Sequence, residues 1–174
     1  MTLALVKVSG AALSLLLWPF LGGSTQGQTI NDVAGFYRLV AIDNVRPNGE
    51  VVQQYGPNPK GALSLDPSGR YVLFVRRAQL TNFEAPNIRE GSAQENRAVV
   101  RGSLAHSGTY TIDGSAKTIT LRVEASTFPN LDGTEIKRPF TLVENDLTYS
   151  MSVPSVGSGI ARLVWRRVKR PSAE

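Results

Sequence analysis

From Gly35 onward the chain alternates short runs of β-branched and aromatic residues with clusters of turn residues. No apolar repeat of about 3.6 residues continues long enough to indicate a major helix, so the pattern predicts an all-β protein. The expected strands are residues 35–42, 50–55, 61–65, 70–77, 104–112, 118–126, 134–143, 147–151 and 160–168.

Turn residues join most of these strands into hairpins. Asn48-Gly49, Asp66-Pro67-Ser68-Gly69 and Asp113-Gly114 are strong hairpin signals, because glycine accepts a positive φ and Asn or Asp tolerates it. Residues 144–146 make a further tight connection. Consecutive hairpins give a meander, whereas a Greek-key sandwich needs long crossovers. The sequence therefore predicts a single antiparallel up-and-down β-barrel of about eight to ten strands.

One connection, residues 78–102 between the fourth and fifth expected strands, is much longer than the others. It is polar and poor in β-branched residues until Ala98. A connection of this length is either a flexible flap or carries a short helix, here near residues 94–100. In both cases we expect it to cover an opening of the barrel.

The N-terminal segment has the layout of a secretory signal peptide. Residues 8–23 carry no charge, residues 11–21 are nearly all apolar, and Lys7 precedes them. The run is shorter than the roughly 20 residues that span a bilayer, although an uncleaved anchor is an alternative. We expect a signal peptide at 1–27 and a barrel domain at 28–174 that is exported, periplasmic or secreted, with no membrane span after cleavage.

The amino-acid composition limits the kinds of catalytic, metal-binding and disulfide sites that the protein can contain. The 174 residues suit one domain, and they include no cysteine and one histidine. Disulfides, thiolate zinc sites, iron–sulfur clusters, cysteine nucleophiles and multi-histidine metal sites are thereby excluded. No metal and no cofactor is expected.

A net charge of +5 and a basic C-terminal segment raise the question of nucleic-acid binding. Within residues 162–168, basic side chains are interleaved with apolar ones, which indicates a strand with a charged outer face. No stacking-aromatic motif or recognition helix accompanies them, so no nucleic-acid partner is expected.

Several short motifs occur together over most of residues 35–168. The most specific is Tyr55-Gly56-Pro57-Asn58-Pro59-Lys60-Gly61, because the spaced set is far rarer than any single residue in it. The others lie at 35–40, 66–70, 107–113, 128–130, 133–135, 138–140 and 163–168. With these motifs the chain resembles the lipocalin-like domain family of the calycin superfamily. The resemblance implies a barrel with a cavity and a small apolar or amphipathic ligand, without an identified activity.

The first strand departs from the family's pattern at one position. Gly35-Phe36-Tyr37-Arg38-Leu39-Val40 is similar to the family's Gly-x-Trp-Arg-Leu-Val, with tyrosine in place of tryptophan. The resemblance implies that Tyr37 closes the bottom of the barrel together with an arginine of the last strand, Arg166 or Arg167.

Alternation along the strands indicates which side chains line a barrel. On residues 70–77 it groups Tyr71, Leu73 and Val75, and Arg77 completes this set at the rim if the set faces inward. Tyr110 is a further candidate. Arg138 either enters the cavity or hydrogen-bonds a loop.

On residues 118–126 the same alternation leaves two interpretations. The simpler one places the apolar face inside. The resemblance keeps open a polar interior face with Arg122, Glu124 and Ser126, because related sequences often carry Glu and Ser at the last two positions. Burying the two charged groups without mutual pairing costs several kcal/mol, so such a face needs internal partners or a polar ligand.

His106 is interpreted as a strand-edge or surface side chain. Ser107, the next residue, points to the opposite face and cannot pair with it.

Three functions fit these observations. The first is a non-catalytic carrier of a small, mainly apolar molecule. The second is an isomerase or cyclase that uses Tyr110, Arg122, Glu124 and His106. The third is an envelope structural or stress protein whose barrel is filled by its own side chains.

Overall fold

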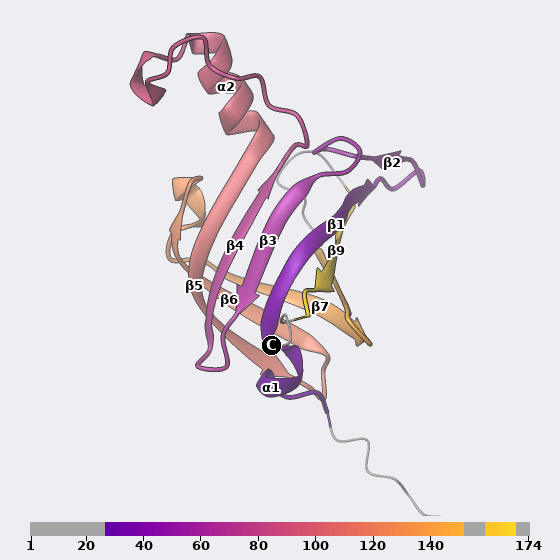
Figure 1. The fold of residues 1–174 in the computed structure, drawn as a ribbon. Helices are drawn as coiled ribbons and strands as arrows, with labels where there is room; N and C mark the ends of the chain where they lie inside the picture. Colours follow the sequence, from indigo (N-terminus) through magenta and orange to yellow (C-terminus); the bar gives the residue numbers. More distant parts are fainter. Residues whose placement is uncertain (1–26, 152–158, 170–174) are drawn as a thin grey trace, which may run out of the picture.

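A computed structural model describes residues 27–151 and 159–169, so the expected signal peptide lies outside the described residues except for Gly27 (Figure 1). The described strands are β1 Gly35–Val45, β2 Val51–Val52, β3 Lys60–Leu65, β4 Arg70–Arg76, β5 Ser103–Asp113, β6 Thr118–Ser126, β7 Glu135–Val143, β8 Asp146–Met151 and β9 Ile160–Arg167. The helices are α1 Ile30–Val33 and α2 Ala93–Gly102, with short 3₁₀ turns at Ile88–Glu90 and Pro129–Leu131.

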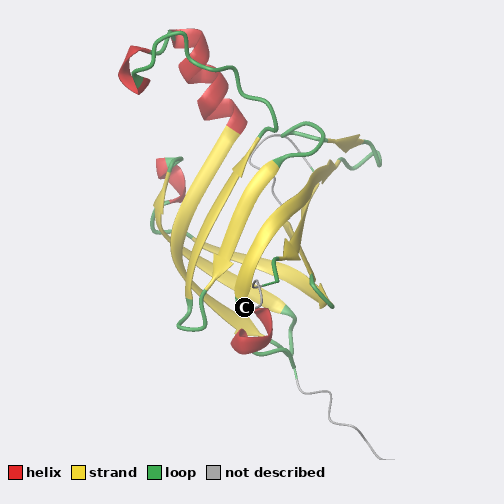
Figure 2. Cartoon of the chain, viewed as in Figure 1, coloured by secondary structure: helices red, strands yellow, loops and turns green. Residues whose placement is uncertain are grey.

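Eight antiparallel strands close into a barrel, with β2 as an extra strand on β1 (Figure 2). The order is β2-β1-β3-β4-β5-β6-β7-β8-β9, and β1 also pairs with β9 from Tyr37–Arg167 to Val45–Ile160. The up-and-down barrel predicted from the hairpin signals is therefore confirmed. Only the expected strand at 50–55 is much shorter than predicted.

The hairpin turns form largely as their residues dictate. In the β3–β4 turn the Asp66 carboxylate accepts the Ser68 N–H at 2.8 Å, and Gly69 takes a φ of 84°. The β5–β6 turn differs in one detail, because the positive φ falls on Lys117 (48°) and not on Gly114. There the Asp113 carboxylate accepts the N–H groups of Ser115 and Ala116, which stabilises the start of the turn.

The long connection between β4 and β5 carries a helix, α2, so the helix alternative is the correct one. Ser92 and Glu95 form a capping box at its start, a local signal for helix initiation. The helix extends beyond the barrel end and leads directly into β5 (Figure 1), and Gly102 is its only buried residue. It does not lie across the opening, which corrects the expectation that this segment covers it. No helix in the described ranges is long and apolar enough to cross a membrane.

Two β-bulges change which residues face inward. Pairing between β1 and β9 shifts at Val40, so Tyr37 and Leu39 point inward before it, and Ile42 and Asn44 after it. Pairing between β5 and β6 shifts at Glu124, because Ser107 is paired with Ala125 and Gly108 with Val123. An extra residue in one strand reverses the alternation beyond it.

Gly108 permits the second bulge. A Cβ atom at this position would lie 1.9 Å from the Arg122 carbonyl oxygen, so no other residue fits against β6 here. The absence of a side chain at Gly108 therefore allows β5 and β6 to come this close together.

One end of the barrel is closed by α1. Val33 is fully buried there, and the Tyr37 hydroxyl donates a hydrogen bond to the Val33 carbonyl at 2.6 Å. The opposite end carries the longer connections and α2 (Figure 1).

Candidate functional site

The barrel interior is lined mainly by apolar and aromatic side chains, as alternation requires. Three of the predicted lining residues, Tyr71, Leu73 and Val75, are each 2% exposed and share the inner face of β4. Tyr110 is also buried, and its hydroxyl donates to the Asp66 carbonyl near the closed end at 2.9 Å. Arg77 lies beyond the end of β4, exposed to solvent, and donates to the Gln54 carbonyl at 3.3 Å. It does not line the interior.

The polar face of β6 points outward at Arg122 and Glu124, so these two candidates are wrong as interior residues. Both are exposed, and Glu124 forms a bidentate ion pair with Arg70 at 2.9 and 2.8 Å. The bulge at Glu124 then turns Ser126 to the same face as His106, its partner in the ladder. The Ser126 hydroxyl donates to the Ala105 carbonyl at 3.2 Å.

His106 is buried, 4% exposed, which corrects its interpretation as a surface or edge residue. Its Nδ1 atom and the Tyr71 hydroxyl are hydrogen-bonded at 2.9 Å, and the two rings meet edge to face. Burial and, to a lesser degree, the charge of Arg138 lower the pKa of His106 from 6.5 to about 4. The imidazole is therefore neutral at physiological pH. The alternation of His106 with Gly108 and Tyr110 along β5 is the sequence signal that could have indicated its burial.

Burial also raises the pKa of the tyrosine hydroxyls inside the barrel. The pKa of Tyr71 rises to about 12, mainly by burial, and the charge of Arg138 partly opposes the rise. Tyr110 reaches about 12 through burial and the nearby Asp66 carboxylate. Both hydroxyls stay protonated over the physiological pH range and act as neutral hydrogen-bonding groups.

Arg138 enters the barrel, which settles the two alternatives left open for it. It lies on β7 between exposed Lys137 and Pro139 and is itself 3% exposed. Its guanidinium carbon stands 4.8 Å from the centre of the Tyr149 ring on β8. The Trp165 ring on β9 lies 6.3 Å from the same tyrosine ring, centre to centre.

Tyr149 and Trp165 were not among the residues predicted to line the site. Both are at most 1% exposed and come from neighbouring strands. Their alternation with Leu147 and Leu163 placed them on the inner faces, but only barrel closure shows that they meet Arg138. Together with His106 and Tyr71, these three residues form a polar cluster inside an otherwise apolar barrel.

The closed end contains the predicted contact between Tyr37 and a last-strand arginine. Arg167 donates to the Tyr37 hydroxyl from Nε at 3.1 Å and from Nη2 at 2.6 Å, and Nη2 also bonds the Asp32 carbonyl. Arg166, the other candidate, points outward and pairs with Asp146 at 2.8 Å. Closure therefore uses Arg167 and not Arg166.

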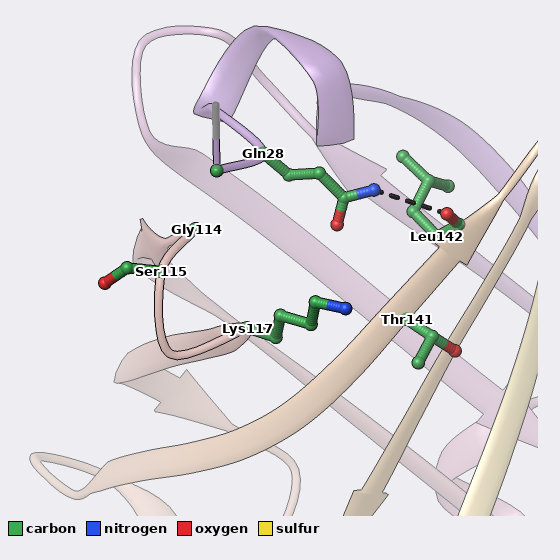
Figure 3. Close-up of a pocket in the computed structure, with 7 residues that line it drawn as sticks. Gln28, Gly114, Ser115, Lys117, Thr141 and Leu142 are labelled. Carbon is green, nitrogen blue, oxygen red and sulfur yellow. Dashed lines mark hydrogen bonds between the residues drawn. The ribbon is translucent and has the colours of Figure 1, made fainter. Parts of the chain in front are cut away.

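Two hollows lie on the outer surface beside α1. One is lined by Gly27, Gln28, Gly114, Ser115, Lys117, Thr141 and Leu142 (Figure 3). Gln28 already donates to the Leu142 carbonyl across it, at 3.2 Å, and none of the lining side chains is buried. A second hollow continues past Glu144 and Arg167. The interior cluster is the stronger candidate, because its polar groups are removed from water.

The described residues contain no group of three or more His, Cys, Asp or Glu side chains that could hold a metal ion. In comparisons with known proteins, the model of a family described as "Lipocalin-like domain" matches residues 34–168. No curated protein matches the chain.

Proposed function

The chain belongs to the lipocalin-like domain family, and we propose that its barrel binds or carries a small, mainly apolar ligand. One observation carries this proposal: an apolar barrel interior that holds a cluster of buried polar side chains, including the charged Arg138, with no buried carboxylate among the described residues. An interior of about eight strands either fills with its own side chains or holds one small ligand. Polar groups that only filled space would be expected to satisfy one another.

Binding is favoured over acid–base catalysis by the arrangement of titratable groups. The residues considered for an isomerase or cyclase are dispersed, since Arg122 and Glu124 lie outside the barrel and Tyr110 is bonded near the closed end. His106, with a pKa of about 4, is a weak base at neutral pH, and Tyr71, at about 12, is a weak acid. The pair is better suited to positioning a ligand than to moving a proton.

Uptake of a neutral fluorescent probe tests this function. We expect N-phenyl-1-naphthylamine to bind the full-length protein saturably, with one site per chain. Trp165 reports on the interior, and in a Trp18→Phe variant it is the single tryptophan. Its emission should change as the probe binds.

A Trp165→Phe variant should lose the tryptophan response, which assigns that response to the barrel interior. If folded protein takes up no probe under any salt or pH condition, the binding function fails. A barrel filled by its own side chains, with an envelope structural role, then becomes the better explanation.

Export is the second part of the proposed function, supported by the uncharged apolar run that follows Lys7. Mass spectrometry of protein recovered from the native host should find a mature N-terminus between Ser24 and Ile30. A Leu15→Arg variant, with a charge inside the apolar run, should keep its full length. An intact Met1 on soluble, folded wild-type protein would contradict export.

A further inference from the structure

We propose that the outer face formed by β1, β3, β4 and β5 docks onto the surface of an anionic phospholipid membrane. This inference goes beyond the proposed ligand binding and does not depend on the barrel interior. It is carried by the side chains that these neighbouring strands direct to solvent and by the sign of their charge.

The burial pattern shows which side chains the four strands direct outward where they pair with one another. The apolar ones are Phe36, Val40, Val72 and Phe74, which are 52%, 37%, 58% and 39% exposed. The basic ones are Arg38, Lys60, Arg70 and Arg76. The remaining ones are small or carry a hydroxyl group, namely Ala62, Ser64, Ser103, Ala105, Ser107 and Thr109. We call this set the β1–β5 face.

The strand register makes this set one continuous surface. In one row Phe36 lies opposite Ser64, and Ser64 lies opposite Val72. In the next row Ala62 lies opposite Phe74. Small side chains of β3 therefore separate the aromatic ring on β1 from the apolar pair on β4, so that these larger groups protrude. β1, β3 and β4 lie side by side, and neither labelled helix crosses them (Figure 1).

The charge of the β1–β5 face is positive, because no Asp or Glu side chain belongs to it. Lys60 and Arg76 lie directly opposite each other on β3 and β4, and neither forms an ion pair with a described residue. Like charges in this position destabilise a sheet. An anionic partner on the face would turn this repulsion into attraction.

The rest of the outer surface differs in this respect. The outward positions of β6, β7 and β8 include Glu124, Glu135 and Asp146, and each of these carboxylates pairs with a basic side chain. The combination of exposed apolar groups and uncompensated positive charge is therefore a local property of the β1–β5 face.

A membrane is the partner that this combination fits best. Apolar side chains surrounded by Lys and Arg are typical of surfaces that bind the interface of an anionic bilayer, where the apolar groups enter the headgroup region and the basic groups contact phosphates. The outside of a barrel is convex, and a fluid bilayer adapts to it, whereas a protein partner needs a complementary concave surface. A second copy fits poorly, since a two-fold contact brings the same basic residues together.

Binding to vesicles tests the proposal. The full-length protein is sedimented with vesicles of phosphatidylcholine alone, or with vesicles in which one third of the lipid is phosphatidylglycerol. We expect binding to be about 10-fold or more tighter with phosphatidylglycerol and to weaken as salt is added. The apolar run at residues 8–23 is present in every protein compared, so differences between variants do not arise from it.

A matched pair of double variants assigns the charge dependence to the face. Arg38→Gln with Lys60→Gln removes two positive charges from the β1–β5 face and should weaken binding to the anionic vesicles about 10- to 30-fold. Arg122→Gln with Lys137→Gln removes the same charge from exposed positions on β6 and β7, and should change binding less than about threefold.

A second matched pair tests the apolar part. Val72→Asp places a carboxylate among the protruding groups of the face and should weaken binding about 10-fold or more. Val143→Asp makes the same change at a 67% exposed position on β7, and should change binding less than about threefold. Both substitutions are on strand surfaces, and circular dichroism checks that the barrel is retained.

Three results would overturn the proposal: equal binding to the two kinds of vesicle, equal losses in the face and control variants, or a dimer in sedimentation velocity that Val72→Asp dissociates. Binding of poly-L-glutamate without binding of vesicles would assign the face to an acidic protein and also overturn it. Uptake of N-phenyl-1-naphthylamine is measured without lipid, so these results leave the proposed ligand binding as it stands.

Discussion

Replacing Tyr37 by alanine is expected to lower the free energy of unfolding by about 3 kcal/mol or more, the range of large aromatic deletions in protein cores. Tyr37 is fully buried, and its hydroxyl links α1, through the Val33 carbonyl, to Arg167 on the last strand. The Arg167 guanidinium also lies over its ring, 5.2 Å from the centre. Alanine therefore leaves a cavity and removes one of the contacts that join β1, β9 and α1 at the closed end. Urea unfolding of the full-length protein measures the loss.

Two further substitutions distinguish the contribution of the Tyr37 ring to stability from that of its hydroxyl and from that of a neighbouring exposed aromatic residue. Tyr37→Phe keeps the ring and should cost about 1–2 kcal/mol, because the Val33 carbonyl and the arginine lose their partner. Phe36→Ala removes a neighbouring aromatic that is 52% exposed on the outer face, and should cost at most about 1 kcal/mol. A loss below about 0.5 kcal/mol for Tyr37→Ala would show that Tyr37 does not hold the closed end together.

The barrel could be predicted from sequence because its determinants are local. Strand β6 coincides with the predicted residues 118–126, and the Asp66–Gly69 turn forms where Asp and Gly occur together. Period-two alternation and turn chemistry act over a few residues, so they can be read without knowing the pairing partners. A meander then follows, since each strand from β3 to β8 pairs with the next and β1 closes the barrel between β3 and β9.

The inner face could not be predicted throughout, because bulges reverse alternation without an unambiguous sequence signal. Strict alternation groups Glu124 with Ser126, but the bulge separates them and leaves Glu124 on the outside with Arg70. The bulge depends on how closely β5 and β6 approach at Gly108. A glycine inside a strand is compatible with a bulge, yet does not indicate which strand carries the extra residue.

The polar cluster was beyond local reasoning for a different reason. Arg138, Tyr149 and Trp165 come from three strands, and whether they meet depends on the strand register and on barrel closure. His106 and Tyr71 meet because β4 and β5 are adjacent, with Tyr71 opposite Gly108 and not opposite the histidine. Alternation indicates a face, but only the register indicates a neighbour.

Acidification should destabilise the protein through His106 before its carboxylates titrate. The pKa of His106 is lowered from 6.5 to about 4 in the folded protein. Between these values the unfolded chain binds a proton that the folded protein does not, so stability falls as the pH decreases. The neutral His106 contributes its full stabilisation above about pH 6.5. By pH 4 the free energy of unfolding has fallen by about 3 kcal/mol, and about 2 kcal/mol of this loss occurs between pH 7 and 5.

The chain suits this measurement because His106 is its only histidine. Asp66 and Asp146 have pKa values lowered by hydrogen bonds from Ser68 and Arg166, so their contribution is lost at a more acidic pH. Urea unfolding at pH 7 and pH 5 should therefore show the loss in the wild type. A His106→Gln variant, whose amide can still bond the Tyr71 hydroxyl, should have nearly equal stabilities at the two pH values. An equal pH dependence in both proteins would mean that His106 is not the buried neutral group responsible.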